Sequence, residues 1–171
     1  MKSTRRFLRL NLVAATVAAL VNLFAVTAEA KDMSSRLGIG YRNQFVTDLP
    51  GIAVQYYPNS DVAIAGAIGI DTQKDFSRFG LMARVHRIIF HESNLHFYMG
   101  AGAAAISAEV AGQNESGFEL QGFTGCEFFF AGLENLGFTF ETGISVVSLS
   151  SNVRFRTFGD SPIRAGITFY F

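Results

Sequence analysis

The final ten residues of the chain, 162–171, alternate strictly between two kinds of side chain. One set is wholly apolar and consists of Ile163, Ala165, Ile167, Phe169 and Phe171. The other set mixes charged, polar and aromatic groups and consists of Arg164, Gly166, Thr168 and Tyr170. Because successive side chains of a strand point to opposite faces, this segment predicts a β-strand with one apolar side. That side must contact either the core of a soluble protein or the hydrocarbon of a membrane.

The first thirty residues predict a secretory signal peptide that is not part of the fold. Its positively charged region contains Lys2, Arg5, Arg6 and Arg9. An apolar stretch over 10–27 follows, and Ala28-Glu29-Ala30 supplies a small-x-small cleavage site. We therefore expect export through Sec, cleavage after Ala30 and a single domain over 31–171. The alternatives are an uncleaved membrane anchor, because the apolar run approaches spanning length, and twin-arginine export, which the residues after Arg6 fit poorly.

The charge balance of the remaining chain excludes some classes of protein. Four of the fourteen Lys and Arg residues and one of the fourteen Asp and Glu residues lie in the first thirty, so the rest carries a net charge of −3. A nucleic-acid-binding protein is expected to be basic. The single cysteine, Cys126, cannot form an internal disulfide. After residue 30 no apolar run reaches the roughly 18 residues of a membrane helix, so we expect none there.

Eight alternating segments separated by short turns follow the predicted leader. We predict strands at 36–46, 51–57, 62–71, 76–90, 95–107, 117–130, 136–148 and 162–171. Most are near the roughly ten residues that a tilted membrane strand needs. An even number of strands places both termini on the same side of the sheet, as single-chain bacterial barrels require.

The connections between these segments alternate in length. The second, fourth and sixth are tight turns at 58–61, 91–94 and 131–135. Two of the others, 108–116 and 149–161, are distinctly longer. Short periplasmic turns opposite longer external loops are typical of outer-membrane barrels.

The two faces of each segment favour a membrane barrel over a soluble one. In segment 136–148, for example, Phe138, Phe140 and Ile144 alternate with Thr139 and Glu141. A soluble barrel of the lipocalin kind would place the apolar residues inside. An eight-stranded lumen has only just enough room for side chains, and these rows of Phe are too large for it. We therefore predict an all-β, eight-stranded antiparallel up-and-down transmembrane β-barrel with apolar residues outside.

The predicted lumen contains charged residues of both signs. They are Arg42, Arg84, Glu119, Glu127, Glu141 and Arg164. Buried ions need partners, because burial of an isolated charge costs several kcal/mol. We expect Glu141, Arg164 and Arg42 to form one network, since their strands are neighbours when the barrel closes. This network would plug the lumen and fix the strand register; the functional alternative is a gated path for protons or ions.

The last connection, 149–161, contains two arginines beside two aromatic residues. If it is extracellular, Arg154 and Arg156 would contact lipopolysaccharide phosphates while Phe155 and Phe158 enter the acyl chains. The alternative is a hairpin that simply extends the last two strands above the membrane.

With a leader, eight alternating strands and a Gly-Ile-Thr-Phe-Tyr-Phe end, residues 36–171 resemble the small eight-stranded outer-membrane barrels, such as the outer-membrane protein A and X-like barrels. The resemblance is architectural. It implies residence in the bacterial outer membrane, contact with membrane lipid and lipopolysaccharide, and an assembly signal at Phe169 and Phe171 that the barrel-assembly machinery reads. It implies no cofactor and no nucleic-acid partner, and we expect a monomer.

One turn also resembles a catalytic motif. The lipid A 3-O-deacylase family uses a His-x-Ser-Asn motif on this fold, and His91-Glu92-Ser93-Asn94 matches its letters. In that family the motif lies in the penultimate strand near the outer leaflet, whereas here it falls in a predicted periplasmic turn. His86, His91 and His96 recur every five residues, but no carboxylate or Cys has matching spacing for a metal. We therefore predict no catalytic residue and no metal.

The sequence thus favours a structural or surface-interaction barrel with a plugged lumen and no catalysis. Two alternatives stay open: a lipid A-modifying enzyme of the deacylase kind, and a narrow conduit for small apolar solutes. No loop motif identifies an external ligand.

Overall fold

The computed structural model describes residues 31–45, 48–110, 112–149, 152–157 and 163–171. They form nine strands: β1 (Leu37–Asn43), β2 (Pro50–Tyr56), β3 (Val62–Asp71), β4 (Arg78–His91), β5 (Leu95–Val110), β6 (Gln113–Phe129), β7 (Leu136–Leu149), β8 (Asn152–Thr157) and β9 (Arg164–Tyr170). In this part of the chain, no helix has the length and apolar character needed to cross a membrane. The predicted signal peptide, 1–30, lies outside the described residues.

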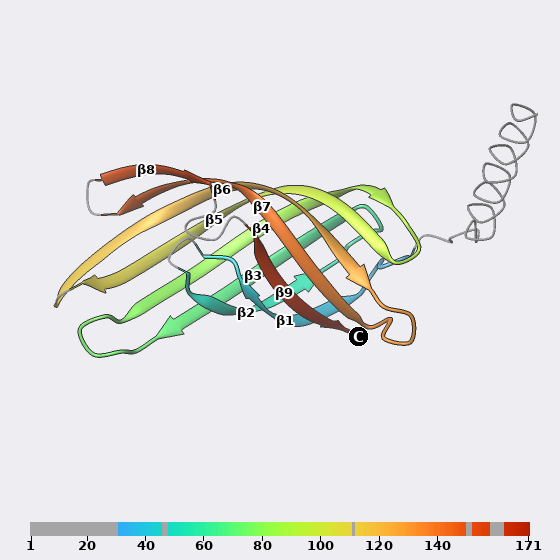
Figure 1. The fold of residues 1–171 in the computed structure, drawn as a ribbon, viewed down its shortest axis with the longest axis horizontal. Helices are drawn as coiled ribbons and strands as arrows, with labels where there is room; N and C mark the ends of the chain where they lie inside the picture. The colour runs from blue at the N-terminus through green and yellow to red at the C-terminus, as the bar shows by residue number, and fades with distance from the viewer. Residues whose placement is uncertain (1–30, 46–47, 111, 150–151, 158–162) are drawn as a thin grey trace, which may run out of the picture.

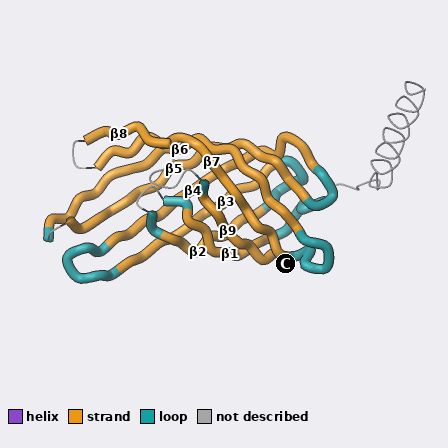
Figure 2. The backbone as a smooth tube through the Cα atoms, viewed as in Figure 1, coloured by secondary structure: helices purple, strands orange, loops and turns teal. Residues whose placement is uncertain are grey.

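The strands close into one antiparallel barrel (Figures 1 and 2). Strands β1 to β7 each pair with the next along the chain, and β9 pairs with both β7 and β1, which completes the ring. The eight-stranded antiparallel barrel predicted from the sequence is therefore confirmed. Closure gives each of the eight strands of the ring backbone partners on both sides, whereas β8 pairs with β7 alone.

The predicted turns at 58–61, 91–94 and 131–135 lie together at one end of the barrel, where Phe171 also lies (Figure 1). Phe171 pairs there with Leu37 through two backbone hydrogen bonds of 2.9 and 3.3 Å. We call this the turn end, and the opposite end the loop end. Both ends of the barrel domain therefore lie on the same side, as an even number of strands requires.

Two of the predicted loops contain more strand than expected. The prediction of a long loop over 108–116 is wrong, because β5 and β6 stay paired up to Val110 and Gln113. Gly112, with a φ of 77°, supports the tight turn between them. In the last connection, β8 pairs with the outer half of β7, which is the predicted hairpin extension.

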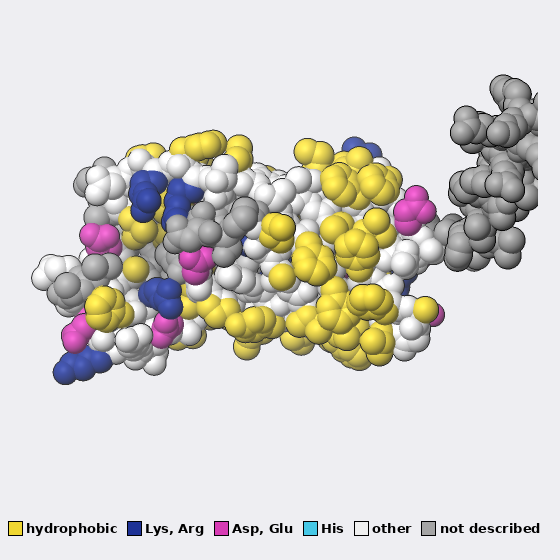
Figure 3. Space-filling view, in the orientation of Figure 1, with side chains coloured by type: hydrophobic (Ala, Val, Ile, Leu, Met, Phe, Trp, Pro, Cys, Tyr) yellow, Lys and Arg dark blue, Asp and Glu magenta, His cyan; other side chains and the backbone are white. Residues whose placement is uncertain are grey.

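The alternation of each strand separates two surfaces. The outward side chains form an apolar belt that includes Ile52, Ile68, Leu81, Val85, Leu120, Ile144 and Ile167. Aromatic residues gather outside the barrel near the turn end: Tyr56, Phe90, Phe130, Phe169 and Phe171. Figure 3 shows hydrophobic side chains over much of the outer surface, densest toward the turn end, with more charged side chains at the loop end. Tyr57, next to Tyr56 in the sequence, is instead fully buried in the lumen.

The lumen is filled in three layers. An apolar cluster occupies the turn end and includes Met33, Tyr57, Ile88, Tyr98, Phe123, Phe129 and Tyr170. A second apolar cluster occupies the loop end and includes Phe45, Leu49, Met82, Ile106 and Val147. Buried charged and polar residues lie between them, so the barrel interior is a packed core that surrounds the candidate site.

Candidate functional site: the charge network in the lumen

All six charged residues expected in the lumen are buried there. They come from five strands around the ring: Arg42 (β1), Arg84 (β4), Glu119 and Glu127 (β6), Glu141 (β7) and Arg164 (β9). The period of two in each strand places them on the inner face, because their neighbours in sequence point outward. The six residues comprise three arginines and three glutamates, so the layer is neutral when all of them are ionised.

Glu141 accepts three hydrogen bonds from two lumen side chains. Arg84 Nη2 donates to both carboxylate oxygens of Glu141, at 2.9 and 2.8 Å. Tyr98 Oη donates to Glu141 Oε1 at 2.7 Å. Arg84 also stacks on the ring of Phe123, with its Cζ 3.7 Å from the ring centroid. Charge-assisted bonds of this kind are among the strongest in proteins.

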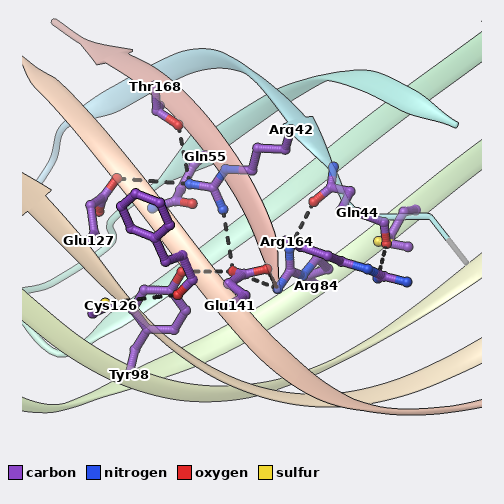
Figure 4. Close-up of polar contacts among 12 residues, drawn as sticks. Arg42, Gln44, Gln55, Arg84, Tyr98, Cys126, Glu127, Glu141, Arg164 and Thr168 are labelled. Atoms are coloured by element: carbon purple, nitrogen blue, oxygen red, sulfur yellow. Dashed lines mark hydrogen bonds and ion pairs between the residues drawn. The ribbon is translucent and has the colours of Figure 1, made fainter. Parts of the chain in front are cut away.

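Arg42 lies between two carboxylates (Figure 4). Its Nη1 lies 3.8 Å from Glu141 Oε1, and its Nη2 lies 3.9 Å from Glu127 Oε1. Arg42 Nη2 also donates to Thr168 Oγ1 at 3.2 Å. The guanidinium of Arg42, on β1, therefore links Glu127 of β6 with Glu141 of β7.

Glu127 accepts hydrogen bonds from two buried tyrosines, one directly after β2 and one on β9. Tyr57 Oη donates to its Oε2 at 2.9 Å, and Tyr170 Oη donates to its Oε1 at 2.6 Å. Gln55 Nε2 donates to both tyrosine oxygens, at 2.9 and 2.8 Å. These bonds join β2, β6 and β9 across the lumen. The network predicted from the sequence omitted both tyrosines, although Tyr170 lies among the inward residues of its alternating segment.

Arg164 belongs to the loop-end side of the network. Its Nη1 lies 4.0 Å from Glu119 Oε1 and donates to Gln121 Oε1 at 3.2 Å. It also donates to the backbone oxygen of Gln44. Glu141 and Arg164 face each other in the register of β7 and β9, yet the close ion-pair partner of Glu141 is Arg84, from across the lumen. The expectation of Glu141, Arg164 and Arg42 as one cluster therefore omitted its shortest ion pair.

Residues 31–36 cover the turn end of the lumen. Met33 is 1% exposed and packs in the turn-end cluster. Lys31 Nζ lies 4.0 Å over the Phe129 ring and donates to the backbone oxygen of Glu134, while the oxygen of Lys31 bonds His96 Nε2 at 3.0 Å. Ser34 donates twice to Asp32, which holds the pKa of that carboxyl below its usual value. The segment after the predicted cleavage site is thus part of the packed barrel.

Residues from the first connection fill the loop end. Phe45 is 0% exposed and Leu49 is 1% exposed. They fit because glycines face them: a Cβ on Gly80 would lie 2.6 Å from the Phe45 ring, and one on Gly69 would lie 2.8 Å from Leu49. The first predicted strand, 36–46, therefore ends early at Asn43, since the chain then turns inward.

The two arginines of the last connection face the barrel axis. Arg154 and Arg156 are opposite Val147 and Ser145 in the register of β7 and β8, and both of these partners are buried in the lumen. Phe155 points outward instead. If these arginines contact lipopolysaccharide as expected, they do so from the inner face of the β7–β8 hairpin. Phe158, the second aromatic residue of that expectation, lies outside the described residues.

Two histidines of the β4–β5 hairpin, His91 and His96, are paired across it, with ring centroids 5.1 Å apart. His86 stacks on Tyr98 in the lumen, with ring centroids 4.4 Å apart. His91 ends β4, and its Nε2 lies 3.3 Å from Asp61 of the neighbouring turn. Ser93 lies in the turn at 91–94 that begins with His91, but it makes no hydrogen bond to His91. The described ranges contain no group of three or more His, Cys, Asp or Glu residues arranged to hold a metal ion.

Comparison with solved structures finds the same fold. The N-terminal β-barrel domain of Pseudomonas aeruginosa OprF matches with a TM-score of 0.55 and 17% identity, over 82% of this chain and 100% of that domain. Neisserial surface protein A (NspA) matches with a TM-score of 0.47 and 17% identity, over 80% of this chain and 94% of that one. No protein-family model matches the chain, and no curated protein matches it.

Proposed function

We propose that the protein is a bacterial outer-membrane β-barrel with a structural or surface-interaction role, a lumen closed by side chains, and no catalytic activity. The observation that carries this proposal is the inversion of a soluble core: matched charges fill the interior and an apolar belt covers the outside. In water, such a belt would expose many large apolar side chains with nothing to cover them. In a bilayer the same side chains contact hydrocarbon, and the closed ring satisfies the backbone.

The shared barrel fold supports the same placement. In this orientation the turn end faces the periplasm and the loop end faces outward, because short turns are periplasmic in outer-membrane barrels. Tyr56, Phe90 and Phe169 then lie at the periplasmic interface, where aromatic residues are enriched.

The closed lumen follows from three layers in series. Met33 and Phe129 pack at the turn end, Phe45 and Leu49 pack at the loop end, and the charge network lies between them. An ion entering the barrel would have to displace a packed apolar cluster and then compete with existing ion pairs. This arrangement supports a structural core over a conduit.

Two measurements on the purified protein test the proposal. We expect the unheated protein to migrate anomalously in detergent gels and to shift on boiling, because a folded membrane barrel resists the detergent. Planar-bilayer recordings should show no steady conductance. Normal migration before boiling would contradict the membrane barrel, and a reproducible open channel would favour the conduit.

The proposed absence of catalysis can be tested at the turn whose sequence matches the His-x-Ser-Asn motif. Asp61 supplies an acid beside His91, but among the described residues no hydroxyl or thiol is hydrogen-bonded to His91, and a triad requires a nucleophile on the base. Ser60 Oγ bonds the Asp61 carboxylate instead, at 3.1 Å. Replacing His91 or Ser93 by Ala should therefore leave the lipid A acylation pattern unchanged by mass spectrometry. Loss of deacylation that depends on either residue would establish the enzyme instead.

A further inference from the structure

Arg87 is the exception in the outer apolar belt. It lies on β4 between the buried His86 and Ile88, so its side chain points outward. Along the described strands, the other outward-facing charged residue is Glu109, which lies next to the loop-end terminus of β5. Charged side chains on a lipid-facing surface are costly unless they reach a polar partner.

The described residues do not supply that partner. No hydrogen bond or ion pair joins the guanidinium of Arg87 to any of them. Asp61 is an acidic residue close to Arg87 in the fold, because its backbone oxygen accepts from Ile88 N at 2.7 Å. The Asp61 carboxylate, however, contacts His91 Nε2 at 3.3 Å and Ser60 Oγ at 3.1 Å.

The depth of Arg87 places its guanidinium within reach of lipid headgroups. Arg87 is opposite Val62, the first residue of β3, and is therefore level with the β2–β3 turn. On the other side it is opposite Met99 of β5, which is exposed on the same face. A flexible arginine at this height extends its charged end to the interface while its methylene groups stay against the apolar surface.

A β-bulge next to Arg87 completes the surface. The register of β4 and β5 shifts between Ile88 and Phe90, so that Ile89 and Phe90 both point outward. Phe90 stacks on Phe97 of β5, with centroids 5.1 Å apart and an angle of 9°. Bulges re-aim side chains at specific positions, and this one places a flat aromatic pair directly beyond the arginine.

We propose that Arg87 binds the phosphate of a phospholipid in the periplasmic leaflet, whose acyl chains lie along Met99 and the neighbouring apolar belt. The proposal rests on the outer-membrane placement given above. The charge of the guanidinium complements the phosphate, and its fork of donors matches two phosphate oxygens. The stacked Phe90 and Phe97 rings would bound the headgroup on the turn side.

Native mass spectrometry of the full-length mature barrel in detergent tests this directly. The probes are phosphatidylglycerol, phosphatidylcholine and a diacylglycerol with the same chains but no phosphate. The wild type should retain both phospholipids better than diacylglycerol. Arg87→Gln should weaken phosphatidylglycerol binding about fivefold and leave diacylglycerol binding unchanged. Arg36→Gln is the matched control, because Arg36 lies at the same end but is bonded to Asn135 at 2.8 Å; it should bind as the wild type does.

Folding is monitored in every variant by heat-modifiable migration. A wild type that fails this assay would contradict the membrane barrel itself, whereas a folded wild type that binds diacylglycerol as well as phosphatidylglycerol would overturn only the lipid site. Unchanged phosphatidylglycerol binding by folded Arg87→Gln would also overturn the lipid site. A wild-type dimer that dissociates in Arg87→Gln would overturn it too, because Arg87 would then contact a second copy of the chain. Arg87→Lys, which keeps the charge, should retain most of the binding and supplies the comparison if Arg87→Gln does not fold.

Discussion

At the scale of single residues, the ion pair of Arg84 and Glu141 is the strongest test of the lumen network. Removing one partner leaves the other charge buried, which costs about 3–5 kcal/mol for a buried pair. We therefore expect Glu141→Gln or Arg84→Met to lower the free energy of unfolding strongly. The double variant should be much milder, because the uncompensated charge is gone.

A double-mutant cycle in lipid vesicles measures this coupling. The matched control is the cycle of Glu141→Gln with Arg164→Met, because Arg164 faces Glu141 in the strand register while bonding Gln121. The coupling energy should be larger for Arg84 than for Arg164. The reverse order, or additivity in both cycles, would contradict the pairing described for the lumen.

The tyrosines around Glu127 provide a second prediction at this scale. Tyr170→Phe removes a hydrogen bond of 2.6 Å to a buried carboxylate. Bonds to charged groups contribute about 1.5–3 kcal/mol, so we expect a loss of that size in the free energy of unfolding. Tyr41→Phe is the control, since Tyr41 is 55% exposed on the outer face. Equal losses in the two variants would show that Tyr170 does not support Glu127.

The sequence predicts which residues enter the lumen better than which residues pair there. Alternation alone placed Arg84, Glu127 and Glu141 on the inner face, where the structure has them. Pairing depends instead on contacts across the lumen, which strand adjacency does not report. Glu141 thus bonds Arg84 on a strand three positions away around the ring. The inward turn of Phe45 was missed for a related reason, because it depends on space left by glycines of other strands.

At the scale of strands and connections, adding one methyl group to β4 tests how Phe45 packs against that strand. A Cβ on Gly80 would lie 2.6 Å from the Phe45 ring, so Gly80→Ala must displace it. Overpacking of this kind costs about 1–3 kcal/mol. Gly122→Ala is a matched control, because its Cβ would meet nothing within 4 Å. Chemical unfolding of both variants should show a loss only for Gly80→Ala; an unchanged midpoint there would show that Phe45 does not occupy this position.

The last strand carries the prediction of an assembly signal. Phe169 and Phe171 point outward on the same face and are 52% and 62% exposed, so neither is needed to fill the lumen. Phe171→Asp should therefore reduce the amount of heat-modifiable protein in the outer membrane by impairing insertion. Phe76→Asp, at an exposed site in the β3–β4 connection, should have little effect. Undiminished levels of the Phe171 variant would remove the assembly-signal argument.

Strand number and direction were accessible from the sequence because each strand carries its own period of two. The eight predicted segments correspond to β1 to β7 and β9. The end of β5 was predicted too early and the start of β6 too late, because polar residues such as Gln113 and Asn114 are typical of a loop, although they pair beyond the apolar belt. The bulge near Ile89 has no local signal in the sequence except an outward Arg87 followed by three apolar residues, 88–90.

At the scale of the whole molecule, one principle accounts for both surfaces. A barrel of eight strands has a lumen too narrow for water-filled passage once side chains occupy it. The inner face is packed like a protein core, with apolar clusters around neutralised charges, and in the proposed membrane placement the outer face contacts lipid. The segments on either side of β1 contribute to the two apolar clusters: Met33 at the turn end, and Phe45 and Leu49 at the loop end.

The series arrangement of these layers predicts how conductance should respond to truncation. Phe45→Ala combined with Leu49→Ala empties part of the loop-end cluster but leaves the charge network and Met33 in place. We expect planar-bilayer recordings of this variant to stay closed, as in the wild type, although its free energy of unfolding should fall by about 2–5 kcal/mol for each large side chain removed. Adding Met33→Ala to the same variant also thins the turn-end cluster, although Tyr57 and Phe129 remain there. Brief, infrequent openings are expected at that stage, because the ion pairs of the middle layer then become the main barrier to ion entry. A steady channel after truncation of the loop-end layer alone would show that the charge network does not close the barrel.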